Sequence, residues 1–151
     1  MVALFAFIHH VAAFALVSAL AVELVLIKGE LNVQSARKLL AADLVFGVSA
    51  GVVLVVGLLR VFYFEKGAAY YFHSLPFIAK FSLFAVVGLL SIYPTMTFLS
   101  WRALLKQGLV PAVAAARRRV IQRIMHWELV GVVLIVLCAA LMARGIGYVG
   151  T

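Results

Sequence analysis

Basic side chains interrupt stretches of this sequence that are otherwise apolar. His9 and His10 lie in the first such stretch, and Lys80 lies in the third, where residues 75–101 are apolar apart from Lys80, Pro94 and a few hydroxyl residues. A charge at the centre of a bilayer is costly, so an ionisable residue within a membrane span marks a candidate site. Imidazole and neutral amine nitrogens on facing helices are suitable axial ligands for the iron of a planar macrocycle. His9 or His10 together with Lys80 therefore forms one candidate ligand pair.

Two simpler interpretations compete with ligation. Lys80 lies only about one helical turn after Pro76, so its long side chain can reach the headgroup region of a membrane. Each histidine can instead hydrogen-bond within a helical bundle or lie at the membrane interface. A bis-histidine site made by His9 or His10 with His73 is also open.

The composition indicates that membrane-spanning helices carry these side chains. The chain has 151 residues, of which 67% are hydrophobic and 12% charged, and its mean hydropathy is +1.20. These values lie outside the range of soluble globular domains. Four apolar runs are each long enough to cross a bilayer as a helix: residues 2–27, 39–64, 75–101 and 120–143. The sequence therefore predicts an all-α fold, an integral membrane four-helix bundle that forms a single domain over residues 1–151.

The first apolar run is expected to remain as a span and not to be removed as a secretory signal. A signal peptide begins with a basic region, which this sequence lacks. The run also stays apolar beyond residues 15–21, whose small side chains resemble a cleavage region.

The formal net charge of +8 is distributed unevenly along the chain. Most basic residues flank the first and third connections between the predicted spans. The positive-inside rule then places these basic loops in the cytoplasm and both termini outside. Because the charge follows the spans, it indicates a topology signal that also meets anionic lipid, and it argues against a nucleic-acid partner. The basic residues of these two loops are Lys28, Arg37, Lys38, Arg102, Lys106, Arg117, Arg118, Arg119 and Arg123.

The helical period relates the two histidines to the interior of the bundle. At about 100° per residue, His9 and Glu23 fall within about 40° of each other on the first helix. His10 points elsewhere. This pattern favours His9 over His10 for the face that the bundle buries, by a modest margin.

The second and fourth predicted helices share a charge pattern that is consistent with two parallel helix-pair repeats. An arginine follows the acidic residue after 17 positions in one case (Asp43 to Arg60) and after 16 in the other (Glu128 to Arg144). A chance origin also accounts for the pattern, because helices that start at the cytoplasmic face commonly begin and end with basic residues. If the repeat exists, the histidines of the first helix and Lys80 of the third lie at similar depth on the outer side.

Two further features concern the inner half of the bundle. Glu23, Asp43 and Glu128 are predicted to form interhelical ion pairs with Arg37, Lys38 and Arg123. A proton or quinol path through the carboxylates is the functional alternative. Gly47 and Gly51 form a small-xxx-small pair, which predicts the close approach of a neighbouring helix.

Four segments of the chain, residues 8–10, 60–67, 90–95 and 141–145, carry a resemblance to a known family. On these segments the whole chain resembles an uncharacterised family of predicted bacterial four-span membrane proteins, a domain of unknown function. More distantly, it is similar to the membrane-embedded, haem-containing protoporphyrinogen IX oxidases, which have a histidine in the first helix and a lysine in the third. His9 or His10 and Lys80 match those positions, whereas the last helix reads His126–Leu129 in place of an Asn-Glu-x-Pro pattern.

The oxidase resemblance implies a haem b near the outer face and electron transfer to or from a porphyrinogen or quinone. We therefore expect a haem-binding redox protein of the bacterial inner (plasma) membrane, in which His9 or His10 and Lys80 ligate the iron. Arg60 and His73 are expected to meet the propionates or the substrate. The resemblance assigns no catalytic residue, and association with further copies of the chain is left open. The alternative is a non-catalytic helical membrane protein without cofactor, which transports a small solute or serves as an accessory subunit.

Overall fold

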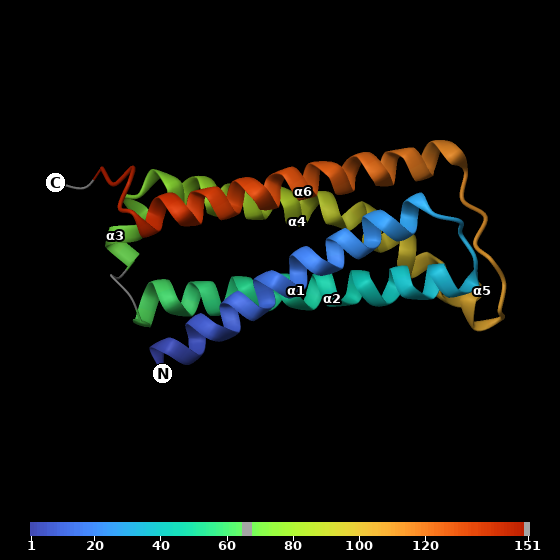
Figure 1. Cartoon of the computed structure of the whole chain (residues 1–151), viewed down its shortest axis with the longest axis horizontal. Helices are drawn as coiled ribbons and strands as arrows, with labels where there is room; N and C mark the ends of the chain where they lie inside the picture. Colours follow the sequence, from blue (N-terminus) through green and yellow to red (C-terminus); the bar gives the residue numbers. More distant parts are fainter. Residues whose placement is uncertain (65–67, 150–151) are drawn as a thin grey trace.

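Four long helices make up most of the computed structural model, which describes residues 1–64 and 68–149. They are α1 (Val2–Lys28), α2 (Val33–Leu59), α4 (Leu75–Ser100) and α6 (Ala115–Ala143). A π-helical turn, η1 (Arg60–Phe64), continues α2, and two short helices, α3 (Ala68–Phe72) and α5 (Arg102–Lys106), lie in the connections. The predicted all-α, four-helix architecture is confirmed (Figure 1).

Each long helix is long and apolar enough to cross a membrane. The four candidate spans have 27–32 residues and mean hydropathies of 2.1–2.4, and about 20 apolar residues are enough for one crossing. Two helices begin earlier than the predicted apolar runs, α2 at Val33 and α6 at Ala115. For α2 the cause is a capping box, in which Asn32 accepts a hydrogen bond from the Ser35 backbone N–H and donates its own N–H to the Ser35 hydroxyl, both at 2.8 Å.

The helices associate as two antiparallel pairs. α1 packs extensively against α2, and α4 packs extensively against α6, whereas the contacts that join the pairs, α1 with α6 and α2 with α4, are fewer. In Figure 1, α1 crosses α2 diagonally and approaches α6 at the end of the bundle opposite to the chain termini. We call that end, with the connections at residues 29–32 and 101–114, the basic end, and the other the terminal end. Two helix-pair repeats would give this pairing, and the repeat itself stays a prediction.

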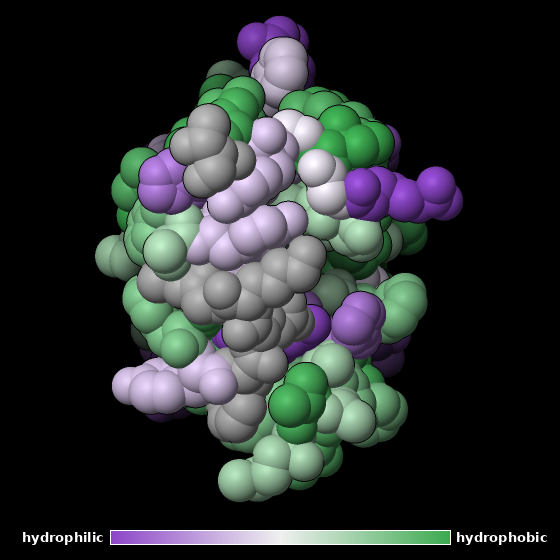
Figure 2. Space-filling view, turned by 90° about the vertical axis from the view of Figure 1, so that its left-hand side faces the viewer, coloured by the Kyte–Doolittle hydropathy of each residue, from purple (hydrophilic) through white to green (hydrophobic). Residues whose placement is uncertain are grey.

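The buried core lies toward the basic end. Toward the terminal end, most described side chains of the four long helices are exposed or half-buried. The view onto the terminal end shows hydrophobic residues along much of the outer margin of the bundle (Figure 2). The two pairs are therefore held together mainly at the basic end. The main core consists of Leu16, Ala19, Leu20, Leu24, Ile27, Ala36, Leu39, Phe46, Val87, Phe98, Trp101, Leu105, Ile121, Met125 and Val132.

Two basic side chains satisfy helix carbonyls at the basic end. Nε of Arg118 donates to the carbonyl of Ile27 at 2.6 Å, and its guanidinium also donates to the carbonyl of Gly29. Arg37 donates to the carbonyl of Leu105 at 2.9 Å. Cations near a helix C-terminus stabilise the last carbonyls and the helix dipole. Arg118 thus links the start of α6 to the end of α1, a role that its place in a basic run did not predict.

The C-terminal segment is fixed to the connection between α3 and α4. The backbone N–H of Leu75 donates to Gly147 at 3.0 Å, and that of Val149 donates to His73 at 3.0 Å. The Tyr148 ring stacks on Tyr70 with a centroid distance of 4.5 Å. These contacts join the segment after α6 to the start of α4, and so tie the two helices of the α4–α6 pair together at the terminal end.

The glycines that permit close helix contacts are not the predicted ones. A Cβ built on Gly47 or on Gly51 would meet nothing within 4 Å, so this small-xxx-small pair makes no close contact with another described helix. A Cβ built on Gly131 of α6 would lie 2.5 Å from Cγ2 of Val87 in α4. The prediction for Gly47 and Gly51 was wrong because spacing alone does not specify which side of a helix meets a neighbour.

Candidate functional site

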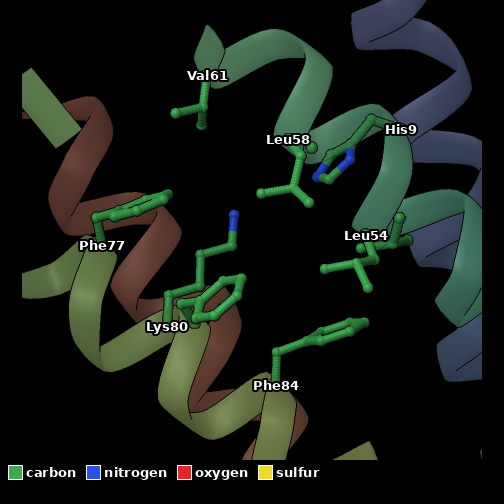
Figure 3. Close-up of a pocket in the computed structure, with 10 residues that line it drawn as sticks. His9, Leu54, Leu58, Val61, Phe77, Lys80 and Phe84 are labelled. Carbon is green, nitrogen blue, oxygen red and sulfur yellow. The ribbon is translucent and has the colours of Figure 1, made fainter. Parts of the chain in front are cut away.

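A pocket near the terminal end lies between the α1–α2 pair and α4 (Figure 3). Its walls are apolar or aromatic apart from two basic side chains, one contributed by α1 and the other by α4. The two candidate iron ligands that the sequence suggested on different helices therefore line the same space. The lining residues are His9, Val53, Leu54, Gly57, Leu58, Val61, Phe77, Lys80, Phe81 and Phe84.

His9 packs directly against the backbone of α2. A Cβ built on Gly57 would lie 3.3 Å from Cε1 and 3.7 Å from Nδ1 of His9. Nδ1 is buried, and no described residue gives it a hydrogen-bond partner. An unsatisfied buried polar atom costs about 1–3 kcal/mol, so a polar partner for the imidazole within the pocket would stabilise this arrangement.

The neighbouring histidine lies outside the pocket. His10 is exposed, and its Nδ1 lies 2.6 Å from the carbonyl oxygen of Ala6. The His9 and His10 rings are 6.1 Å apart and nearly perpendicular, at 88°. Of the two histidines, His9 is the one on the inward face, as the helical period favoured.

Lys80 extends from α4 into the pocket, toward the space that His9 also faces (Figure 3). Phe77 and Phe84 flank it on the same helix, three positions before and four positions after, which places all three side chains on one face. These phenylalanines were not among the predicted site residues. Their spacing from Lys80 is the sequence signal that would have identified them.

Arg60 and His73 do not line the pocket. Arg60 begins η1 and is half-buried, one residue before Val61, which does line it. His73 is exposed in the turn before α4, with Nδ1 at 2.7 Å from the carbonyl oxygen of Ala69. Of the predicted site residues, the structure therefore brings His9 and Lys80 together, with Arg60 next to the lining and His10 and His73 outside.

The two nitrogen ligands that the pocket offers are chemically suited to haem iron. The volume of the pocket, however, is small. An imidazole from α1 and an amine from α4, between apolar walls, are chemically reasonable ligands for haem iron. The pocket volume is about 50 Å³, which accommodates one to a few water molecules. Sites for larger organic ligands measure about 300–1,000 Å³. A macrocycle between His9 and Lys80 thus requires the two helix pairs to separate at the terminal end, where few buried side chains join them.

A second group of ionisable residues lies deeper, toward the basic end. Glu23, Asp43 and Glu128 come from α1, α2 and α6 and are only 2%, 7% and 2% exposed. The carboxyl group of Glu23 interacts electrostatically with the other two. Asp43 accepts a hydrogen bond from the Thr95 hydroxyl at 2.6 Å, and Oε1 of Glu23 and of Glu128 is buried without a partner among the described residues.

The ion pairs predicted for these carboxyl groups are not formed in the described part of the chain. The guanidinium of Arg37 donates to a backbone carbonyl, and Lys38 and Arg123 are exposed. Long basic side chains at the inner ends of the spans remain at the surface because leaving water is costly for them. The carboxyl groups are therefore buried together without a basic partner among the described residues.

Replacing Glu128 by glutamine is expected to leave the free energy of unfolding unchanged or to raise it. The amide keeps the size and hydrogen-bonding capacity of the side chain, removes its charge and breaks no ion pair. If a buried cation did pair with Glu128, its loss would cost about 3–5 kcal/mol. Reversible unfolding in mixed micelles measures the difference, with Glu23→Gln as a parallel variant. A loss of that size in either variant would contradict this description of the cluster.

Comparison with known proteins places the chain in a family. A family model described as "Predicted membrane protein (DUF2214)" matches residues 1–147. No curated protein matches the sequence, and no solved structure matches it. The resemblance to an uncharacterised family of membrane proteins is thereby confirmed, and these comparisons give no support to the more distant resemblance to the haem oxidases. This chain, with its four apolar helices, belongs to the DUF2214 family of predicted membrane proteins.

Proposed function

We propose that this protein binds haem b between its two helix pairs and acts as a redox protein of the bacterial inner membrane. The observation that carries the proposal is the placement of His9 of α1 and Lys80 of α4 in one apolar pocket (Figure 3). Haem bound there would supply one-electron transfer, and His9 and Lys80 would be the residues that hold its iron. Lysine can do so only as the neutral amine.

The surroundings of the pocket define what the other residues would do. Phe77, Phe81 and Phe84 would exclude water and pack against the planar ring. Arg60, adjacent to the lining, is suited by its fixed positive charge to meet a propionate. His73 lies further out, where it can meet a propionate or an incoming porphyrinogen or quinone. In this proposal the terminal end, with both chain termini, faces away from the cytoplasm.

The distribution of buried residues gives a physical route to a larger pocket. The extensive contacts lie within the α1–α2 and α4–α6 pairs, and the main core joins the pairs toward the basic end. Separation of the pairs at the terminal end would therefore disturb few buried contacts. Rigid-body movement of packed elements about a retained interface is a common way for proteins to open a site.

The visible spectrum of the purified protein tests this proposal. The protein is expressed with haem supplied, solubilised in detergent and examined for a Soret band after removal of free haem. We expect the band in the unaltered protein, its loss in His9→Ala and a changed or absent band in Lys80→Met. His10→Ala is the matched control, because His10 is adjacent in sequence but outside the pocket, and it is expected to retain the band.

Two outcomes would contradict haem binding. One is a well-folded, haem-supplied protein without a Soret band, and the other is a band that Lys80→Met and His9→Ala leave unchanged. Both variants must elute as single species, so that loss of the band is not loss of the fold. A cofactor-free transport or accessory protein would show no chromophore, and its Lys80→Met variant would fold and function normally.

A further inference from the structure

A second hollow lies at the basic end, between the start of α2 and the short helix α5. It has a volume of about 390 Å³ and is lined by Arg37, Arg102, Leu105 and Lys106. Three of these four side chains are basic, and none is acidic. This volume falls within the range of about 300–1,000 Å³ that is common for sites of small organic ligands.

The basic side chains reach the hollow from two helices and converge for structural reasons. Arg102 and Lys106 are four residues apart on α5, so they lie on the same face of that helix. Arg37 comes from α2, and its guanidinium is tied to α5 by the hydrogen bond to the carbonyl of Leu105, at 2.9 Å. The fold therefore holds three positive charges around one opening, and like charges so placed repel one another.

An anion in the hollow would remove this repulsion, and phosphate fits the donors best. Guanidinium groups bind phosphate oxygens through paired N–H donors, and an ammonium group adds a compact positive charge. Arg37 uses one N–H for Leu105 and keeps further donors for a ligand. Basic pockets between transmembrane helices at the cytoplasmic side are known to bind phosphate-bearing lipid headgroups.

We infer that the hollow lined by Arg37, Arg102 and Lys106 is a binding site for a phosphate group. Two sources share this chemistry, namely the headgroup of an anionic phospholipid and a free phosphate-bearing solute. The site lies at the opposite end of the bundle from the His9–Lys80 pocket and does not depend on haem binding.

A pair of double variants tests the inference with equal changes in net charge. Arg102→Gln with Lys106→Gln removes two charges from the hollow. Arg117→Gln with Arg119→Gln removes two exposed charges from the start of α6, outside the lining of the hollow. Arg37 and Arg118 are left unchanged because they satisfy helix carbonyls.

Two measurements distinguish the sources of the phosphate group. Retention of phosphatidylglycerol is followed by native mass spectrometry after delipidation and titration, with phosphatidylcholine, which is zwitterionic and has no net charge, as the reference. Binding of inorganic phosphate is followed by calorimetry in a neutral detergent. Each basic residue near a membrane surface contributes about 1 kcal/mol to such binding, so the Arg102/Lys106 variant is expected to weaken it about 25-fold. The Arg117/Arg119 variant is expected to weaken it about twofold or less, because exposed charges at a distance are screened.

The two binding measurements lead to different conclusions about the ligand of the hollow. Selective loss of phosphatidylglycerol in the Arg102/Lys106 variant, without binding of inorganic phosphate, assigns the site to a lipid headgroup. Binding of inorganic phosphate that the same variant weakens and that competes with the lipid shows that the phosphate group itself is the ligand. Equal weakening by both double variants, or binding that neither variant changes, would overturn the inference.

Discussion

Gly131→Ala is expected to lower the free energy of unfolding by about 1–3 kcal/mol, the usual cost of overpacking a closely packed interface. The added methyl carbon would lie 2.5 Å from Cγ2 of Val87. Val87 is 5% exposed, and its branched side chain has little rotational freedom in a helix. The steric conflict between the added methyl group and Val87 can therefore be relieved only if α4 and α6 move apart. Unfolding of the purified protein in mixed micelles measures the loss.

Two further variants separate steric conflict from a general effect of alanine. Val87→Ala in the Gly131→Ala background removes the opposing methyl groups and is expected to restore part of the lost stability, which a double-mutant cycle quantifies. Gly51→Ala, where nothing lies within 4 Å of the new methyl, is expected to stabilise α2 by about 0.5–1 kcal/mol through helix propensity. Equal effects of Gly131→Ala and Gly51→Ala would contradict the proposed contact.

Gly147→Ala is expected to destabilise the terminal end by about 2–3 kcal/mol. Gly147 has a φ of +80°, a left-handed conformation that costs an L-residue about 1–2 kcal/mol. Its added Cβ would also lie 2.7 Å from Cδ of Pro76, and the proline ring has no rotamer that moves it away. The hydrogen bond from Leu75 to the Gly147 carbonyl would weaken in consequence. Hydrogen exchange of the Leu75 and Val149 amides, with thermal unfolding, reports the change.

The neighbouring glycine provides the control for this variant. Gly145 has a similar φ of +68°, but a Cβ there would meet nothing within 4 Å. Gly145→Ala is therefore expected to lower the free energy of unfolding only by the cost of the left-handed conformation, about 1–2 kcal/mol. The difference between the two variants isolates the contact with Pro76. If both variants are equally destabilised, the C-terminal segment does not pack on the start of α4 in the folded protein.

Gly131 and Gly147 matter for the pocket because they stabilise the α4–α6 pair that carries Lys80. Gly131 sets the distance between the two helices, and Gly147 ties the end of the chain to the first turn of α4. Lys80 lies one turn further along α4, and His9 is positioned from the other pair by its contact with Gly57. The separation of His9 and Lys80 is thus a property of how the two pairs meet.

The site was partly predictable because helical geometry restricts where side chains point. The 100° period placed His9 on the inward face and His10 off it, and charge spacing suggested that Lys80 lies at similar depth. Neither pattern showed which helices would be neighbours. The predicted ion pairs of Glu23, Asp43 and Glu128 failed for another reason. Long basic side chains can remain in water, whereas short carboxyl groups stay where the backbone carries them.

The sequence alone is enough to predict the class of this protein. Its apolar runs require membrane-spanning helices, because backbone polar groups cannot go unsatisfied in hydrocarbon, and its basic loops define one end of the bundle. Three features depend on how the helices pack in space. Gly131, and not Gly47 or Gly51, permits close packing. Arg118 satisfies carbonyls at the end of α1, and His9 and Lys80 line one pocket between the helix pairs. Spacing fixes the face of a helix, but contact between two faces depends on the crossing of helices that lie far apart in the chain.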